Sequence, residues 1–132
     1  MRINAVHFIL YVKDQQVATE FYSRILAREP RLNVPGMTEF EIDASTIIGL
    51  MPYTSVANLF GNDKAAQEDQ MVLKTELYLI VDDPKLFHSR AIEAGASELS
   101  PFAERDWGHA AAYSVDMDGN VIAFARAITE EA

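Results

Sequence analysis

Two side chains with useful chemistry occupy matching places in the two halves of the sequence. His7 and Glu76 stand near the start of apolar segments, and an aspartate follows each after seven residues, at Asp14 and Asp83. An imidazole nitrogen and a carboxylate oxygen can both ligate a divalent metal ion. Placed close together without a metal, the same two groups can act as general acid and base. Simpler interpretations stay open, with His7 as a hydrogen-bonded core residue and Glu76 at the solvated end of its strand.

Capping residues and apolar periodicity predict the elements that position these side chains. Residues 6–12 form a short apolar run, which favours a strand buried on both faces. Asp14 is expected to cap a helix that ends before Pro30, and Pro84 to begin a second helix that ends near Gly95. The apolar stripe predicted on the first helix consists of Val17, Phe21, Tyr22, Ile25 and Leu26.

The remaining segments complete two similar runs of strand, helix and strands. Further strands are predicted at 38–42, 46–51, 76–81, 113–115 and 121–128, and a helical turn is predicted at 55–60. A loop is expected to begin at Pro101, and the polar residues 61–70 are expected to form a crossover or lid. The repeat predicts one domain with module one at about 1–56, a crossover at about 57–72 and module two at about 73–132. A ferredoxin-like sandwich is the alternative, although it needs fewer strands after each helix.

Composition excludes several classes of function. The 132 residues include 20 acidic and 11 basic side chains, for a formal net charge of -9, which disfavours binding to nucleic acid. No apolar run reaches the roughly 20 residues of a membrane span, and no signal peptide is expected. Cysteine is absent, so disulfides and thiolate metal sites are excluded, and a cytoplasmic location is expected.

The repeat and its local motifs resemble the glyoxalase/bleomycin-resistance/extradiol-dioxygenase superfamily, also called vicinal oxygen chelate proteins. The matching motifs are the run 7–14, Phe21-Tyr22, Ile25-Leu26, the run 81–83, the segment 94–96, Trp107-Gly108 and the turn 116–120. In that turn Met117 stands where the superfamily usually has proline. The resemblance implies an α+β fold of two tandem βαβββ modules, with curved sheets around a pocket, and it implies a homodimer.

The resemblance also implies where metal ligands stand in metal-dependent members of the superfamily. His7 and Glu76 occupy the first-strand positions, whereas Gly49 and Ala123 occupy the last-strand positions and cannot coordinate. Two ligands hold a catalytic ion weakly, because such ions usually take three protein ligands and an open position. His109 or Asp116 would have to substitute from a loop. We therefore expect neither a tightly bound metal nor another cofactor.

Aromatic and other large side chains are candidates for the lining of a pocket. Trp107 lies in a loop with Gly108 and His109, where an amphipathic ring is expected to form a pocket wall or a dimer contact. The expected ligand-binding residues are His7, Phe40, Met51, Glu76, Tyr78, Trp107, His109 and Tyr113. Residues at the alternating strand positions, such as Phe40, are also common in an ordinary core.

Three functions are compatible with these observations. The first is a protein that binds a small organic molecule in an apolar, aromatic-lined pocket without a tightly bound metal, as the bleomycin-resistance type does. The second is a metal-dependent lyase, isomerase or dioxygenase that uses His7 and Glu76, whose ion polarises vicinal oxygens of a substrate. The third is a structural or regulatory dimer without a ligand. Gly49 and Ala123 favour the first function, because neither residue can coordinate a metal ion. Whether the chain is an enzyme stays open, and catalysis is the less favoured outcome.

Overall fold

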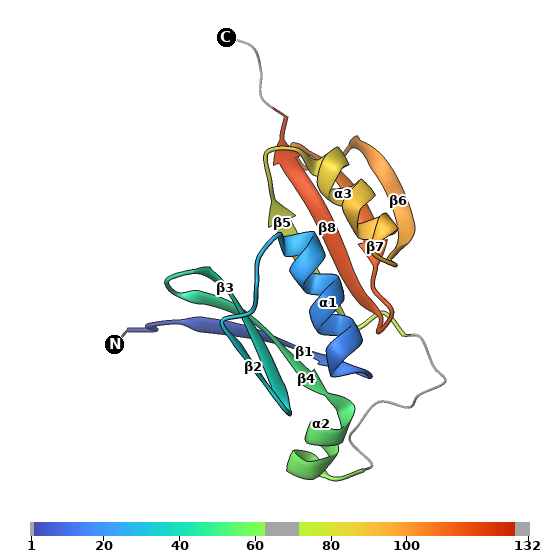
Figure 1. The fold of residues 1–132 in the computed structure, drawn as a ribbon. Helices are drawn as coiled ribbons and strands as arrows, with labels where there is room; N and C mark the ends of the chain where they lie inside the picture. The colour runs from blue at the N-terminus through green and yellow to red at the C-terminus, as the bar shows by residue number, and fades with distance from the viewer. Residues whose placement is uncertain (1, 63–71, 129–132) are drawn as a thin grey trace. The chain divides into compact units, whose positions relative to one another are not determined.

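The computed structural model describes residues 2–62 and 72–128 (Figure 1). The chain divides into two compact units, residues 1–70 and 71–132, and each is described by itself. Residues 63–71, which belong to the predicted crossover or lid, lie outside the described residues. None of the described helices is long and apolar enough to cross a membrane.

The first unit is a four-stranded mixed sheet with one long helix and one short helix. Its elements are β1 (Val6–Val12), α1 (Gln15–Leu26), β2 (Leu32–Val34), β3 (Met37–Asp43), β4 (Thr46–Pro52) and α2 (Tyr53–Phe60). The strand order is β1-β4-β3-β2, with β1 parallel to β4 and the other pairs antiparallel. The sequence did not predict β2, which has only three residues.

The second unit repeats this topology. Its elements are β5 (Thr75–Ile80), α3 (Pro84–Glu93), β6 (Ser97–Glu104), β7 (His109–Val115) and β8 (Asn120–Ala127). The strand order is β5-β8-β7-β6, and β5 and β8 form the parallel pair. Both units are therefore βαβββ modules, which confirms the predicted α+β fold.

The two aspartates at matching positions begin the two long helices. An Asp14 carboxylate oxygen accepts a hydrogen bond of 3.0 Å from the amide of Val17. Asp83 accepts one of 3.3 Å from Leu86, and Pro84 takes the first helical position as predicted. Each cap satisfies a backbone donor that the helix itself leaves without a partner.

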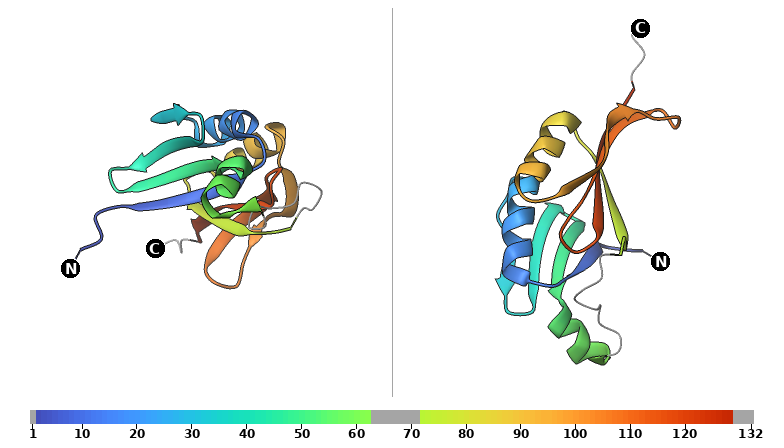
Figure 2. Two further views of the ribbon diagram at one scale, coloured as in Figure 1. Left: turned by 90° about the horizontal axis from the view of Figure 1, so that it is seen from below. Right: turned by 90° about the vertical axis from the view of Figure 1, so that its right-hand side faces the viewer.

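Each long helix covers one face of its own sheet (Figure 2). In the first unit, the hydroxyls of Thr19 on α1 and Thr38 on β3 lie 2.9 Å apart, which identifies the face that α1 covers. In the second unit the ring of Phe87 on α3 contacts that of Phe124 on β8, with centroids 5.4 Å apart. Because side chains alternate along a strand, the residues on the other face follow from these contacts. We call the face of each sheet that its long helix does not cover the open face.

Three local predictions were wrong. Only Leu10 and Val12 of β1 are buried, because β1 is an edge strand with one face toward α1. Val17 is 44% exposed and lies off the buried stripe of α1. The segment beginning at Pro101 is part of β6 and not a loop. β6 is an edge strand, and an edge strand tolerates a proline. The register between β6 and β7 also shifts near Pro101.

Candidate binding site

The open face of the second sheet carries a row of two tyrosines with an alanine between them. Ala123 on β8 pairs in register with Tyr78 on β5 and with Tyr113 on β7. Alternation along β5 places Glu76 on the same face, and its side chain is exposed. The tyrosine ring centroids are 6.5 Å apart. The position that the resemblance assigned to a metal-ligating glutamate is thus a fully buried methyl group between two phenol rings.

A hydrogen-bonded network joins Trp107, Tyr78 and His109 beside this row. Nε1 of Trp107 donates a hydrogen bond of 2.9 Å to the Tyr78 hydroxyl. The same hydroxyl lies 2.7 Å from Nδ1 of His109, and the rings of Tyr78 and His109 stack with centroids 5.6 Å apart. Trp107 nevertheless keeps 52% of its surface exposed. Its polar edge is held while much of the ring remains accessible.

The turn between β6 and β7 fixes the position of Trp107. The amide of Arg105 donates to the carbonyl of His109 at 2.7 Å, and Gly108 adopts a φ of +88° that residues with a Cβ rarely adopt. The guanidinium of Arg105 donates to the carbonyls of Pro101 and Ala111, each at 2.8 Å. The loop that carries the single tryptophan is therefore tied to both neighbouring strands.

Tyr113 has an altered acidity because of its surroundings. Burial raises the pKa of Tyr113, and the negative charge of Glu76 and the neighbouring Tyr78 raise it further. Arg105 acts in the opposite direction, with its guanidinium carbon 5.2 Å from the centre of the Tyr113 ring. The phenol thus stays protonated to a higher pH than an ordinary tyrosine.

The open face of the first sheet carries a charged group around His7. Nδ1 of His7 lies 3.8 Å from a carboxylate oxygen of Glu39 on β3. The other oxygen of Glu39 accepts from Nε of Arg31 at 2.9 Å and lies 2.9 Å from its Nη2. Glu39 also pairs in register with Gly49, the empty ligand position of this unit. Sequence reasoning missed Glu39 and Arg31, although the alternation along β3 places Glu39 on this face.

The remaining predicted residues lie in different places. Met51 is on the open face of the first sheet, opposite Tyr11. Phe40 is fully buried on the face that α1 covers, so we leave it out of the site. Asp116 holds the turn before β8 by accepting from the amides of Asp118 and Asn120 at 2.8 Å. His7 and Glu76 belong to different units, and their pairing stays a prediction.

The donor atoms on the open faces do not fit a tightly held metal ion. Gly49 and Ala123 lie at the open-face positions that the resemblance assigns to ligands, and neither has a donor atom. The carboxylate of Glu39, which lies 3.8 Å from His7, is already paired with Arg31. Among residues 2–62 and 72–128, no group of three or more histidine, aspartate or glutamate side chains is arranged to hold a metal. A divalent ion usually needs at least three protein ligands.

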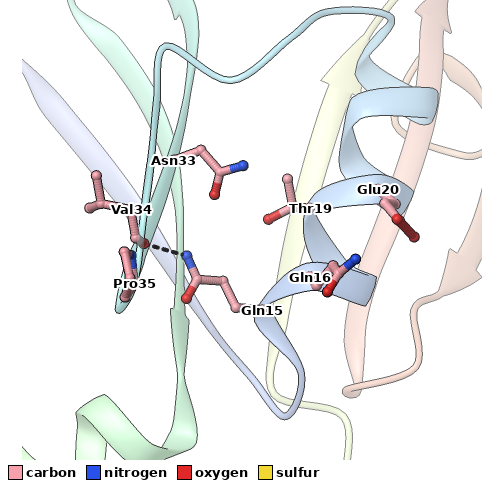
Figure 3. Close-up of a pocket in the computed structure, with 7 residues that line it drawn as sticks. All are labelled: Gln15, Gln16, Thr19, Glu20, Asn33, Val34 and Pro35. Atoms are coloured by element: carbon pink, nitrogen blue, oxygen red, sulfur yellow. Dashed lines mark hydrogen bonds between the residues drawn. The ribbon is translucent and has the colours of Figure 1, made fainter.

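The first unit also contains a groove between α1 and β2 (Figure 3). Its volume is about 580 Å³. The Gln15 side chain forms one end, where Nε2 donates to the carbonyl of Val34 at 2.8 Å and Oε1 accepts from the amide of Gly36 at 2.9 Å. The other lining residues are Gln16, Thr19, Glu20, Asn33 and Pro35. These two hydrogen bonds tie the Gln15 side chain to the turn between β2 and β3.

Comparison with solved structures identifies proteins of the same fold. A glyoxalase/bleomycin resistance protein/dioxygenase from Nocardioides is 18% identical with a TM-score of 0.77, covering 99% of this chain and 87% of that chain. A glyoxalase/bleomycin resistance protein/dioxygenase family enzyme from Burkholderia phytofirmans PsJN is 16% identical with a TM-score of 0.78, covering 92% and 97%. A glyoxalase-related enzyme from Fulvimarina pelagi is 16% identical with a TM-score of 0.75, covering 96% and 88%.

These neighbours confirm the predicted resemblance at the level of the fold. Structural neighbours across the chain are glyoxalase/bleomycin resistance/dioxygenase proteins, and the identities are low. No protein-family model and no curated protein matches the sequence. The function must therefore be argued from the residues of this chain.

Proposed function

We propose that this protein binds a small organic molecule on the open face of the second sheet, without a tightly bound metal. The observation that carries the proposal is the half-exposed ring of Trp107, whose indole edge is fixed by Tyr78 while much of the ring is accessible. A large aromatic surface that is held in place loses little conformational freedom when it binds a partner.

The neighbouring residues supply the other features of a small-molecule site. Tyr78 and Tyr113 offer aromatic surface on either side of Ala123, which pairs in register with both. Sites for small organic molecules are mostly apolar and carry a few well-placed polar groups. His109, Glu76 and the guanidinium of Arg105 are polar groups on or beside this face. The negative charge of Glu76 and of the whole chain favours neutral or cationic ligands over anionic ones.

The fluorescence of the single tryptophan provides a direct test. We expect benzyltrimethylammonium, which is both aromatic and cationic, to change Trp107 emission along a saturable curve. The Tyr78→Ala and Tyr113→Ala variants should each weaken binding about tenfold, which corresponds to about 1.4 kcal/mol. Tyr53→Ala serves as the matched control, because Tyr53 lies in α2 of the first unit. A linear, unsaturable change, or equal weakening by Tyr53→Ala, would contradict the proposal.

Metal analysis tests the alternative of a metal-dependent lyase, isomerase or dioxygenase. We expect protein dialysed against buffer without chelator to hold much less than one equivalent of nickel, zinc, manganese or iron. The physical reason is the donor set, in which Gly49 and Ala123 contribute no atom. One tightly held equivalent that is lost in a His7→Ala variant would favour the metal-dependent function instead.

A further inference from the structure

The network around Tyr78 determines which nitrogen of His109 carries the proton. The indole of Trp107 can only donate, so the Tyr78 oxygen is the acceptor of that bond. A phenol has one proton of its own to donate. The partner 2.7 Å away is Nδ1 of His109, which in a neutral imidazole is either a donor or an acceptor.

Only one assignment uses all three groups fully. If Tyr78 donates to Nδ1, its single proton and one lone pair are both engaged, and Trp107 is satisfied as well. If Nδ1 donated instead, the Tyr78 oxygen would accept twice and its proton would need another partner. Among the residues that the structure describes, the Tyr78 hydroxyl bonds to Trp107 and His109 alone. Hydrogen bonding therefore favours the tautomer of His109 with its proton on Nε2.

We propose that Trp107, acting through Tyr78, holds His109 as the Nε2–H tautomer, and that this N–H recognises a hydrogen-bond acceptor such as a carbonyl oxygen on the ligand. The second half rests on the proposed function, whereas the first half does not. Nε2 and Nδ1 are separated by Cε1, so the N–H bond at Nε2 points in a different direction from the hydrogen bond between Nδ1 and Tyr78. In the described part of the chain no hydrogen-bond partner contacts Nε2, so its proton is available. Stacking on Tyr78 fixes the plane of the ring.

Trp107 and Tyr78 then have separate roles. Tyr78 is the direct partner that accepts from the indole and donates to the imidazole. Trp107 is a positioning residue, because its indole N–H occupies the Tyr78 oxygen as a hydrogen-bond acceptor. A protonated Nδ1 of His109 would have to compete with the indole for that oxygen. Without the indole, the Tyr78 oxygen can accept from Nδ1, and the other tautomer becomes accessible.

Long-range ¹H–¹⁵N NMR spectra of the histidine rings measure the tautomer without any ligand. At a pH where His109 is neutral, the wild-type protein should show a protonated Nε2 and an unprotonated Nδ1. Trp107→Phe and Tyr78→Phe should each give a mixture of tautomers. Tyr113→Phe is the control and should leave the tautomer unchanged, since the Tyr113 hydroxyl takes no part in the network. His109→Gln assigns the signal among the three histidines.

The tautomer result decides the first half of the proposal. A wild-type His109 protonated on Nδ1, or a Tyr78→Phe spectrum identical to that of the wild type, would overturn it. Circular dichroism of each variant shows whether the fold is retained. A His109 signal that behaves as expected supports the assignment even if no ligand is found.

Binding of a matched pair of probes decides the second half. Acetophenone and ethylbenzene have similar shapes, but only acetophenone has a carbonyl oxygen. By NMR titration the wild-type protein should bind acetophenone about tenfold more tightly, and His109→Phe should abolish this preference while keeping a ring to stack on Tyr78. Equal affinity of the wild-type protein for both probes would overturn the role of Nε2. Binding of neither probe would overturn it as well and would count against the proposed function, but not against the tautomer.

Discussion

Gly49 lies directly opposite Glu39 across the antiparallel pair of β3 and β4. A Cβ atom at Gly49 would meet Cγ1 of Ile9 and Sδ of Met37 at 3.4 Å, which is an ordinary van der Waals distance. Its backbone also lies outside the left-handed region. We therefore expect Gly49→Ala to fold normally and to raise the free energy of unfolding by about 0.5 kcal/mol, because alanine restricts the unfolded chain. Urea denaturation measures the change.

Gly36 provides the contrast for this substitution. Its φ is +98°, and a Cβ there would lie 3.2 Å from the Ser55 hydroxyl. Gly36→Ala should therefore lower the free energy of unfolding by about 1 kcal/mol or more. A loss of stability in Gly49→Ala as large as that in Gly36→Ala would show that β4 has no room for a side chain at its open face.

The acidity of Tyr113 should respond to Glu76. Burial raises the pKa of this phenol first, and the charge of Glu76 adds to the effect. We expect Glu76→Gln to move the pKa of Tyr113 back toward its ordinary value of 10.0. Titration of ¹³C-labelled tyrosine by NMR measures it, and Glu98→Gln is the control because Glu98 does not act on Tyr113. An unchanged titration in Glu76→Gln would contradict the account.

The raised pKa of Tyr113 also predicts how stability depends on pH. The folded protein binds more protons than the unfolded chain once the pH exceeds the ordinary tyrosine value. The stabilisation from Tyr113 is therefore fully present below about pH 10 and is lost as the pH rises through the higher folded-state pKa. In Tyr113→Phe the decline of the melting temperature above about pH 10 should be less steep than in the wild type. An equal or steeper decline would contradict this sign.

Asp116 should be important for stability rather than for metal binding. It is buried and accepts from the amides of Asp118 and Asn120 and from the Asn120 side chain at 2.9 Å. Asp116→Ala should lower the free energy of unfolding by about 3 kcal/mol, because buried donors lose a charged acceptor. Asp43, which accepts from the amide of Ser45 in an exposed turn, offers a comparison, and Asp43→Ala should have a smaller effect. Denaturation measures the free energy of unfolding of both variants. An equal loss in the two would show that the burial of Asp116 is unimportant.

Gln15 should hold the turn between β2 and β3 in place. Its amide bonds to Val34, Gly36 and the Thr38 hydroxyl, so Gln15→Ala should lower the free energy of unfolding by about 1–2 kcal/mol. Hydrogen exchange of the Gly36 amide should become faster, since that amide loses its acceptor. Gln16→Ala, on the next residue of α1, removes none of these bonds and should leave the exchange rate unchanged. An equal exchange rate of the Gly36 amide in both variants would contradict this role of Gln15.

The sequence predicted the fold because its signals are local. The capping carboxylates of Asp14 and Asp83 and the turn at 116–120 act on backbone groups within a few residues. In each half the capping aspartate follows seven residues after His7 or Glu76, so the repeat could be recognised. Edge positions were harder to predict. The burial of β1 and the proline in β6 depend on which strand lies alongside, and no local pattern encodes that neighbour.

The candidate site was predictable only in part. Strand alternation pointed to Tyr78 and Tyr113, and the uniqueness of Trp107 in its loop pointed to that residue. Their hydrogen bonds were not predictable, because Tyr78 and Trp107 are 29 residues apart and meet only after β5, β7 and β8 pair. The contact of His7 with Glu39 likewise depends on the order β1-β4-β3.

The amino-acid sequence by itself determined the two long helices, most of the strands, the twofold repeat and the lack of donor atoms at Gly49 and Ala123, since residue identity and short-range spacing decide these features. Only the tertiary structure decided which polar groups meet. Hydrogen bonds and ion pairs between strands require side chains to approach within about 3–4 Å. That approach is set by strand order and register, which are properties of the folded sheet.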